Sequence, residues 1–433
     1  MAGMLNRREM LASLLAAPLP VAPRARPNLV ILLADDLGHR DVGFNGRREW
    51  STPHLDRLAS EGTVFDRWYT ACPLCAPSRA ALLTGRYGIH NGVRDNATDL
   101  PSREVTLAEA LKPAGYRTAL IGKWHQGAEP RTHPLDQGFD DFFGYLSATA
   151  AWEHFPKTLF RGRQEVLVNG YSCDLLADEA TRFIDAHRDQ PFFLYLPFIE
   201  PHFWIEAPEE NLQKHRGRFP EKDPARPVNA AYAAMIERLD AAIGRVVRKI
   251  DEAGLRERTL ILFSSDNGAT FEQRTYGAPW YHDSNHPFRG QKRSLEEGGI
   301  RVPGVVRWPG QVPTGRRADA PVMMIDVMPT MLAAVGVVAP REWDLDGANL
   351  LDFWCSRSLA PERTLFWEFT AEGWDMHAAM RGDWKFLQIG SNRWLYNIKL
   401  DPQERRSLAP EHPEIFHRLE TELAAWKRTA RTS

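Results

Sequence analysis

The chain has 433 residues, with 54 lysines and arginines against 56 aspartates and glutamates, a formal net charge of −2, and 43% hydrophobic residues. This composition is typical of a globular protein that is long enough to build a large hydrophobic core. The near-neutral charge argues against a nucleic-acid or anionic-membrane partner, and four cysteines are too few for a disulfide scaffold.

The first 26 residues have the pattern of an export signal. Arg7 and Arg8 precede an apolar stretch at 10–21, which is too short for a bilayer that needs about 20 residues. The paired arginines resemble a twin-arginine signal. We therefore expect residues 1–26 to direct export to the periplasm or out of the cell, without a membrane span. The alternative is a disordered N-terminus.

Strand-like and helix-like segments alternate along the next 300 residues or so. In chain order, apolar runs predict strands at 28–33, 116–122, 192–198, 259–263 and 302–306. Capped or amphipathic segments predict helices at 51–60, 106–111, 175–186, 229–253 and 326–335. This alternation predicts an α/β fold, with a large, mostly parallel sheet between two layers of helices.

The pattern changes after residue 340. Short strands are predicted at 363–369, 378–388 and 394–397, and a final helix at 413–428. We expect a large domain at 27–340 and a small C-terminal α+β subdomain at 341–433 that contains a short antiparallel sheet.

Polar side chains follow four of the predicted strands. In chain order they are Asp35 and Asp36, Lys123 and His125, Glu200 and His202, and Asp266 and Asn267. The carboxyl ends of parallel strands lie along one edge of a sheet, where ligands bind. We therefore expect these side chains to meet in one crevice.

The acidic members of this group suggest a metal site. Two adjacent carboxylates point to opposite faces of a regular strand, but where the strand ends the chain turns, and both can face one centre. Together Asp35, Asp36, Asp266 and Asn267 offer oxygen ligands, which suit Ca²⁺ or Mg²⁺ and not zinc. Ca²⁺ is favoured because it tolerates irregular geometry. The alternative for a single Asp-Asp pair is a solvated turn.

The basic members suggest an anionic substrate. Lys123 and Lys292, with Arg79, would supply several donors to the oxygens of a charged ester. His125 and His202 at strand ends that face the same centre are interpreted as an acid and a base, although lone histidines are more often ordinary core or surface residues.

A short cysteine motif carries the most specific signal. Cys72 and Cys75 form a C-x-x-C, but no second such pair exists to complete a zinc site. Helical pattern begins at Ser78, so Cys75 is expected near a helix N-terminus, where negative charge is favoured.

These motifs resemble the type I sulfatase family of the alkaline-phosphatase-like superfamily. Residues 75–86 match its signature C-x-P-S-R-x-x-x-L-T-G-R, and residues 115–125 match G-Y-x-T-x-x-x-G-K-W-H. Weaker matches extend the resemblance over about 27–410. One departure follows His202, where relatives often carry a further proline and this chain has Phe203-Trp204-Ile205.

The resemblance implies a role for each of ten residues. Cys75 would be converted to formylglycine by a maturation enzyme, and Arg79 would steady that group. Asp35, Asp36, Asp266 and Asn267 would hold Ca²⁺, and Lys123 and Lys292 would bind sulfate oxygens. His125 would act on the hydrated aldehyde and His202 on the leaving group.

The function expected from these roles is hydrolysis of sulfate monoesters. A phosphate or phosphonate monoester hydrolase of the same superfamily is the nearest alternative, because its site geometry suits either anion. A glycan-binding pseudoenzyme is the second alternative.

The substrate expectation depends on tryptophans in predicted loops. Trp152, Trp204, Trp280 and Trp374 lie near motif segments and could stack on sugar rings, or could simply fill the core. We expect a sulfated glycan, with a small aryl sulfate as the alternative.

Overall fold

The computed structural model describes residues 26–430. The expected export signal at 1–26 therefore lies outside the described residues except for Arg26. No helix of the described part has the length and apolar character that crossing a membrane requires.

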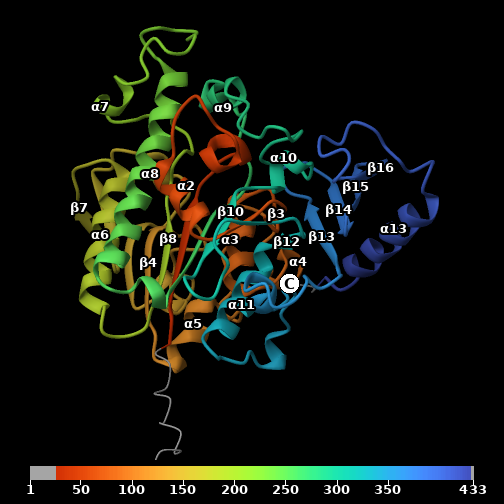
Figure 1. The fold of residues 1–433 in the computed structure, drawn as a ribbon, viewed down its shortest axis with the longest axis horizontal. Helices are drawn as coiled ribbons and strands as arrows, with labels where there is room; N and C mark the ends of the chain where they lie inside the picture. Colours follow the sequence, from red (N-terminus) through yellow and green to blue (C-terminus); the bar gives the residue numbers. More distant parts are fainter. Residues whose placement is uncertain (1–25, 431–433) are drawn as a thin grey trace, which may run out of the picture.

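A mixed sheet of ten strands forms the centre of the molecule (Figure 1). From one edge to the other, its strands are β11 (Arg316–Ala318), β2 (Thr63–Phe65), β10 (Gly304–Arg307), β9 (Thr259–Ser265), β1 (Asn28–Ala34), β8 (Phe192–Pro197), β4 (Arg117–Lys123), β5 (Asp141–Tyr145), β6 (Thr158–Arg161) and β7 (Gln164–Leu167). The five strands from β9 to β5 run parallel. The predicted fold class is confirmed.

Alternate residues of β1 point into two different hydrophobic cores. Val30 and Leu32 pack in the core that includes α2 (Pro53–Ser60), α6 (Ser172–His187) and α8 (Val228–Glu252). Leu29 and Ile31 pack in the core that includes α3 (Cys75–Thr84), α5 (Leu107–Leu111), α11 (Val327–Ala334) and α12 (Leu351–Trp354). The sheet is therefore buried on both faces, which explains its continuous apolar strands.

Local sequence signals explain where α5 begins and where α3 ends. Thr106 and Glu109 form a reciprocal capping box at the start of α5. Gly85, with φ of 67°, ends α3. The remaining helices of the large unit are short: α4 (Gly88–Asn91), α7 (Glu209–Leu212), α9 (Ala278–Tyr281) and α10 (Glu297–Ile300).

The C-terminal part forms a second sheet, which is the blue lobe on the right of Figure 1. Its four antiparallel strands are β13 (Thr364–Phe369), β14 (Met376–Arg381), β15 (Trp384–Ile389) and β16 (Asn392–Asn397), and α13 (Pro413–Lys427) packs on them. A minor sheet pairs β3 (Trp68–Tyr69) with β12 (Val322–Met323).

Two predictions from the sequence were wrong in detail, and one predicted strand differs in its bounds. The strand expected at 378–388 is a hairpin that turns at Gly382, where φ is 60°. The strand expected at 302–306 is present as β10, which spans Gly304–Arg307 and runs antiparallel to β9 within the mostly parallel sheet. Helix α3 begins at Cys75 and not at Ser78.

Candidate active site

The predicted site residues lie together at the carboxyl edge of four neighbouring parallel strands. β9, β1, β8 and β4 are adjacent in this order in the sheet. The residues that follow them, in the same order, are Asp266 and Asn267, Asp35 and Asp36, Glu200 and His202, and Trp124 and His125; Lys123 is the last residue of β4.

Asp36 marks the turn that lets two adjacent carboxylates face one centre. Its φ of 63° lies in the left-handed region, so the chain leaves the strand direction immediately after Asp35. The Asp36 amide donates to Oδ1 of Asp266 (3.1 Å), and Nδ2 of Asn267 donates to Oδ1 of Asp36 (2.7 Å). The two strand ends are thus tied to each other through their acidic residues.

The donor set at this centre fits a hard divalent cation. One ligand atom each from Asp35, Asp36, Cys75 and His202 lies within 4.8 Å of the others. Oδ1 of Asn267 is buried and has no hydrogen-bond partner in the part of the chain that the structure describes. Carboxylate oxygens with a free amide oxygen are ligands that Ca²⁺ and Mg²⁺ prefer.

Three buried cations balance the three aspartates. Arg79 donates to Oδ2 of Asp266 from Nε (2.9 Å) and from a terminal nitrogen (2.8 Å). Lys123 Nζ lies 2.6 Å from Oδ2 of Asp35, and Lys292 Nζ lies 2.8 Å from Oδ1 of Asp36. Charged hydrogen bonds of this kind offset the desolvation of buried ions.

The pKa values of Asp35 and Asp266 are shifted in opposite directions. Burial by itself raises the pKa of Asp35, but the charges of Lys123, Arg79 and Lys292 bring it well below its usual range. Burial and the Asp35 charge raise the pKa of Asp266 to about 6, against the opposing effect of Arg79.

Cys75 is the first residue of α3 and points at the acidic centre. Its Sγ lies 3.5 Å from Oδ1 of Asp35 and 4.0 Å from Oδ1 of Asp36. The residue is only 1% exposed, and burial followed by the Asp266 charge raises the pKa of its thiol well above the usual value. An unmodified Cys75 would thus stay protonated, which makes it a weak nucleophile.

The two predicted histidines follow neighbouring strands, His202 after β8 and His125 after β4. His202 donates from Nδ1 to the Phe203 carbonyl (2.9 Å), and its Nε2 lies 3.7 Å from Oδ2 of Asp36. Neither ring nitrogen of His125 has a hydrogen-bond partner in the described chain. Burial lowers the pKa of both histidines well below the usual value, so each imidazole is neutral in the free protein.

His154 and Glu200 form a buried pair that supports His202. This pair was not identified from the sequence. His154 Nε2 donates to the His202 carbonyl (2.9 Å), and His154 Nδ1 lies 3.6 Å from Oε1 of Glu200. The same Glu200 carboxylate accepts from the Ser172 hydroxyl and from the Cys173 amide. Glu200 was visible as part of a strand-end cluster, but His154 lies in a loop without any motif.

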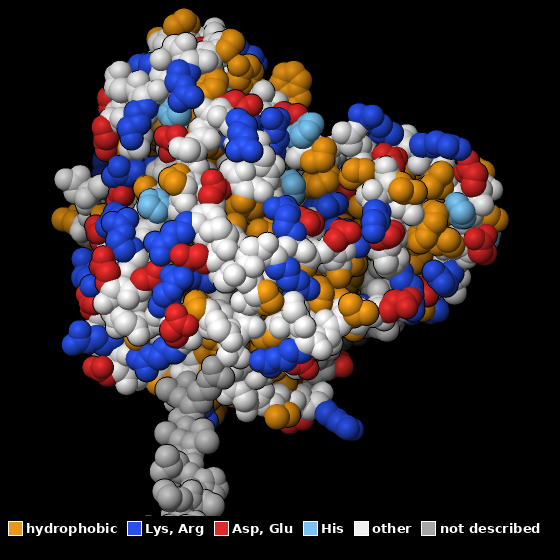
Figure 2. Space-filling view, in the orientation of Figure 1, with side chains coloured by type: hydrophobic (Ala, Val, Ile, Leu, Met, Phe, Trp, Pro, Cys, Tyr) orange, Lys and Arg blue, Asp and Glu red, His pale blue; other side chains and the backbone are white. Residues whose placement is uncertain are grey.

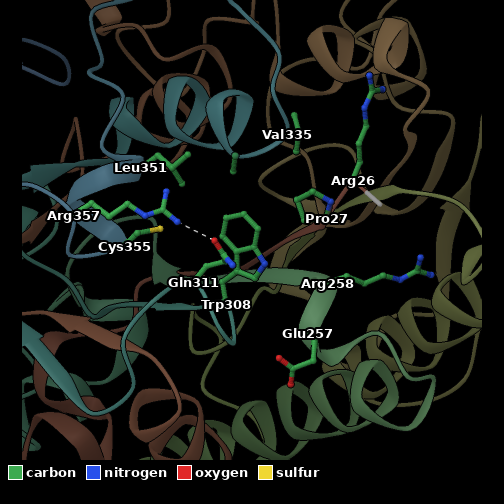
Figure 3. Close-up of a pocket in the computed structure, with 11 residues that line it drawn as sticks. Arg26, Pro27, Glu257, Arg258, Trp308, Gln311, Val335, Leu351, Cys355 and Arg357 are labelled. Carbon is green, nitrogen blue, oxygen red and sulfur yellow. Dashed lines mark hydrogen bonds between the residues drawn. The ribbon is translucent and has the colours of Figure 1, made fainter. Parts of the chain in front are cut away.

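A second cavity lies away from this site. It measures about 520 Å³ and is lined by Pro27, just before β1, and by Glu257 and Arg258, just before β9 (Figure 3). It therefore opens at the amino ends of the strands that bear the site at their carboxyl ends. In Figure 3 the charged groups of Arg26, Glu257 and Arg258 point away from one another, and Arg357 donates a hydrogen bond to Oε1 of Gln311 (3.0 Å).

Comparison with known families gives two matches. Residues 27–337 match the model described as Sulfatase, and residues 286–429 match the model described as N-sulphoglucosamine sulphohydrolase, C-terminal. Together they include every predicted site residue and the C-terminal sheet.

Individual relatives agree with these models. Steryl-sulfatase of Mus musculus is 30% identical over 96% of this chain and 85% of its own length. N-acetylgalactosamine-6-sulfatase of Homo sapiens is 33% identical over 75% of this chain, and the match spans 65% of that longer protein.

Solved structures resemble the whole chain. The structure described as Ps i-CgsB is 30% identical, with a TM-score of 0.87 over 94% of both chains, and the same protein has been solved with k-i-k-neocarrahexaose (TM-score 0.86). A phosphonate monoester hydrolase of Agrobacterium radiobacter shares the fold at 20% identity, with a TM-score of 0.68.

Proposed function

Because this chain belongs to the sulfatase family and is a sulfuric ester hydrolase, we propose that it cleaves sulfated carbohydrates with a formylglycine made from Cys75. The observation that carries this proposal is the position of Cys75: it begins α3, and its Sγ lies 3.5 Å from one carboxylate of the acidic centre. The hydrated aldehyde of that residue supplies a nucleophile that a buried thiol lacks.

The reaction is the hydrolysis of R–O–SO₃⁻ by water to an alcohol and sulfate. Lys123 and Lys292, each on one aspartate of the pair, bind sulfate oxygens and place the sulfur against residue 75. Arg79 donates hydrogen bonds to Asp266 and to the Lys123 carbonyl (3.2 Å). It therefore fixes α3, which begins with Cys75, against the carboxyl end of β4.

Two histidines move the protons. One hydroxyl of the hydrated aldehyde loses its proton and bonds to sulfur as the S–O bond to the alcohol breaks, and His202 gives a proton to the departing alcohol oxygen. His125 then takes the proton of the second hydroxyl as the C–O bond to sulfate breaks, and the aldehyde that forms again adds water. His125 is suited to the role of base because it is neutral and its ring nitrogens have no partner in the described chain. His202 gains its proton as the anionic ester binds, because a nearby negative charge favours the imidazolium.

Asp35, Asp36, Asp266 and Asn267 would hold the divalent cation, which we propose to be Ca²⁺, with Mg²⁺ as the alternative. The cation would add positive charge next to the sulfate oxygens. The glycan substrate is supported by Ps i-CgsB, which is solved with a neocarrahexaose. A small aryl sulfate remains the second candidate.

The paired arginines at Arg7 and Arg8 support a further proposal, export to the periplasm or beyond the cell. A maturation enzyme would convert Cys75. The assignment of 27–340 as the catalytic domain and 341–433 as the C-terminal subdomain is part of the same proposal.

Mass spectrometry of the peptide that carries Cys75 tests the nucleophile. Protein purified from its native host should show the aldehyde or its hydrate at residue 75, and Cys75→Ala should abolish turnover of a chromogenic aryl sulfate. An active enzyme in which every Cys75 is an unmodified thiol would contradict the proposal. Faster turnover of the matching aryl phosphate would favour the phosphoester hydrolase instead.

A further inference from the structure

A row of aromatic rings leads away from His202 toward the protein surface. The Phe203 ring lies 4.0 Å from the His202 ring, and the Trp152 ring lies 5.3 Å from Phe203 (centroid distances). Trp204 continues the row to Tyr276 at 6.3 Å. Phe203 and Trp204 directly follow His202 in the chain, so the row begins at the border of the site.

Two exposed arginines lie on these rings. The guanidinium carbon of Arg274 is 4.7 Å from the centre of the Trp152 ring and 5.5 Å from that of Phe203. The guanidinium carbon of Arg226 is 4.2 Å from the centre of the Tyr276 ring. One aromatic ring, that of Phe203, thus separates the Arg274 charge from the His202 imidazole.

Neither of these arginines has an acidic partner. Within residues 26–430, Arg226 and Arg274 form no ion pair, whereas nearby Arg293 pairs with both Glu272 and Glu372. An arginine that is fixed on an aromatic ring but unpaired keeps its donors available for an incoming anion. Figure 2 shows Lys and Arg side chains gathered near α9, which begins two residues after Tyr276.

A hollow adjoins the second arginine. Its cavity of about 420 Å³ lies within the size range of small-molecule sites. It is lined by the basic Lys222 and Arg226, the aromatic Phe271 and Tyr276, and the acidic Asp223 and Glu272, together with Val228, Gln273 and Gly277. Tyr276 belongs both to this hollow and to the aromatic row, so the two are continuous. The hollow offers cations and aromatic faces, the pairing that suits a charged sugar, and one of its two carboxylates, Glu272, is already paired with Arg293.

We infer that Arg274 and Arg226 form an anion subsite that binds a second acidic group of a sulfated oligosaccharide, while its sugar rings lie along Trp152, Trp204 and Tyr276. This inference rests on the proposed function and sharpens its substrate class: the substrate carries at least one sulfate or carboxylate besides the ester that is cleaved.

The test compares two oligosaccharides with the same backbone, one bearing a single sulfate and one bearing a second sulfate on a neighbouring sugar. For each we measure kcat/KM and take the ratio. Arg274→Met keeps the contact with the rings but removes the charge, so the preference for the disulfated substrate should fall roughly threefold to tenfold. Arg274→Lys should retain most of it.

Arg226→Met provides an independent second variant, and Arg405→Met, at an exposed arginine of the C-terminal part, is the matched control. The preference should also fall with added salt in the parent and much less in Arg274→Met. An unchanged preference in both the Arg274→Met and Arg226→Met variants would overturn the subsite.

A binding measurement tests the anion subsite separately from the proposed sulfatase reaction. The Cys75→Ala protein is titrated with the disulfated oligosaccharide, with and without Arg274→Met, and tryptophan fluorescence is followed. Weaker binding in the double variant, with no sulfate released by the parent, would support the subsite and refute the proposed activity. Unchanged binding, with aryl sulfate turnover intact, would refute the subsite alone.

Discussion

His202 connects the acidic centre to the aromatic row. Its Nε2 lies 3.7 Å from Asp36, while its Nδ1 is committed to the Phe203 carbonyl. His154 holds its carbonyl from the other side. The ring therefore has one free nitrogen and a fixed direction, as a proton donor to a leaving group requires.

His202→Ala should slow hydrolysis most for esters whose alcohol is a poor leaving group. The expected loss in kcat is about 10²- to 10⁴-fold for a sugar sulfate, because the departing alkoxide then lacks a proton. For an aryl sulfate with an electron-withdrawing ring the loss should be much smaller, since that leaving group departs without help. Steady-state rates across a leaving-group series measure the difference.

His417→Ala is the control, because its side chain is 71% exposed on α13, far along the chain from every site motif. It should leave the whole series unchanged. Equal losses on activated and unactivated esters in His202→Ala would remove the proposed acid role.

At the scale of elements, a close approach between two loops fixes Asn267. A Cβ at Gly268 would lie 1.8 Å from the Gly298 carbonyl oxygen, and the Gly268 amide donates to the Gly299 carbonyl (3.0 Å). The turn after β9 thus packs backbone to backbone against α10. Only glycine leaves room for this contact.

Gly268→Ala should weaken both the fold and the cation site. The clash must shift backbone, at a cost of about 1–3 kcal/mol in unfolding free energy, and the shift moves Asn267 relative to Asp36. Thermal unfolding with and without Ca²⁺ measures both effects, because a ligand that binds only the native state raises Tm. We expect a lower Tm and a smaller gain on adding Ca²⁺.

Gly310→Ala serves as the comparison. Gly310 has a φ of 71°, and a Cβ at this position would have no atom within 4 Å, so only backbone strain applies there. It should lower Tm slightly and keep the full gain from Ca²⁺. The same gain in Gly268→Ala and in the parent would show that this contact does not position the site.

At the scale of the whole molecule, a buried ionic cluster joins the C-terminal sheet to the large unit. Lys385 on β15 lies 2.8 Å from Oε1 of Glu297 on α10 and 3.0 Å from Oε1 of Glu404. The Glu297 amide donates to Glu404 (2.8 Å), and the Tyr69 hydroxyl donates to Glu297 (2.7 Å). The cluster thereby anchors α10, the helix against which the Gly268 turn packs.

Lys385→Met should be strongly destabilising and should make stability depend on pH. Removing one partner leaves buried carboxylates uncompensated, which costs about 3–5 kcal/mol. Burial raises the pKa of Glu404 to about 7 from its usual 4.5, although Lys385 opposes this effect. Between these values the folded state holds a proton that the unfolded state has lost, so the free energy of unfolding falls as pH rises through this range.

Without Lys385 the free energy of unfolding should fall more steeply as pH rises. The variant should therefore be destabilised less at pH 5 than at pH 8, relative to the parent. Denaturant unfolding at both pH values measures it. Lys399→Met is the matched control, because Lys399 is 60% exposed and its ion pair with Asp319, at 3.8 Å, lies at the surface. If the free energy of unfolding fell by the same amount at both pH values, the buried carboxylates would not be the groups that become protonated when Lys385 is removed.

Much of the architecture was predictable because it depends on local pattern. Buried strands are continuous apolar runs, and the capped segment at 106–111 became α5. The strand directions at the sheet's margin were not predictable, since β10 looks like any other apolar run and only its partners decide that it runs antiparallel. The hairpin at 376–389 was predicted as one strand because both of its arms carry the same strand pattern, and only the turn at Gly382 separates them.

The sequence by itself determined the family resemblance, the fold class and the residues proposed for the chemistry, because each is written in short motifs at the ends of apolar strands. Only the tertiary structure decided how these residues meet. Asp36 turns through a left-handed conformation, Glu200 and His154 support His202, and Arg274 lies on rings from two other loops. These contacts join residues far apart in the chain, so no local pattern encodes them and only the packed sheet and its loops bring them together.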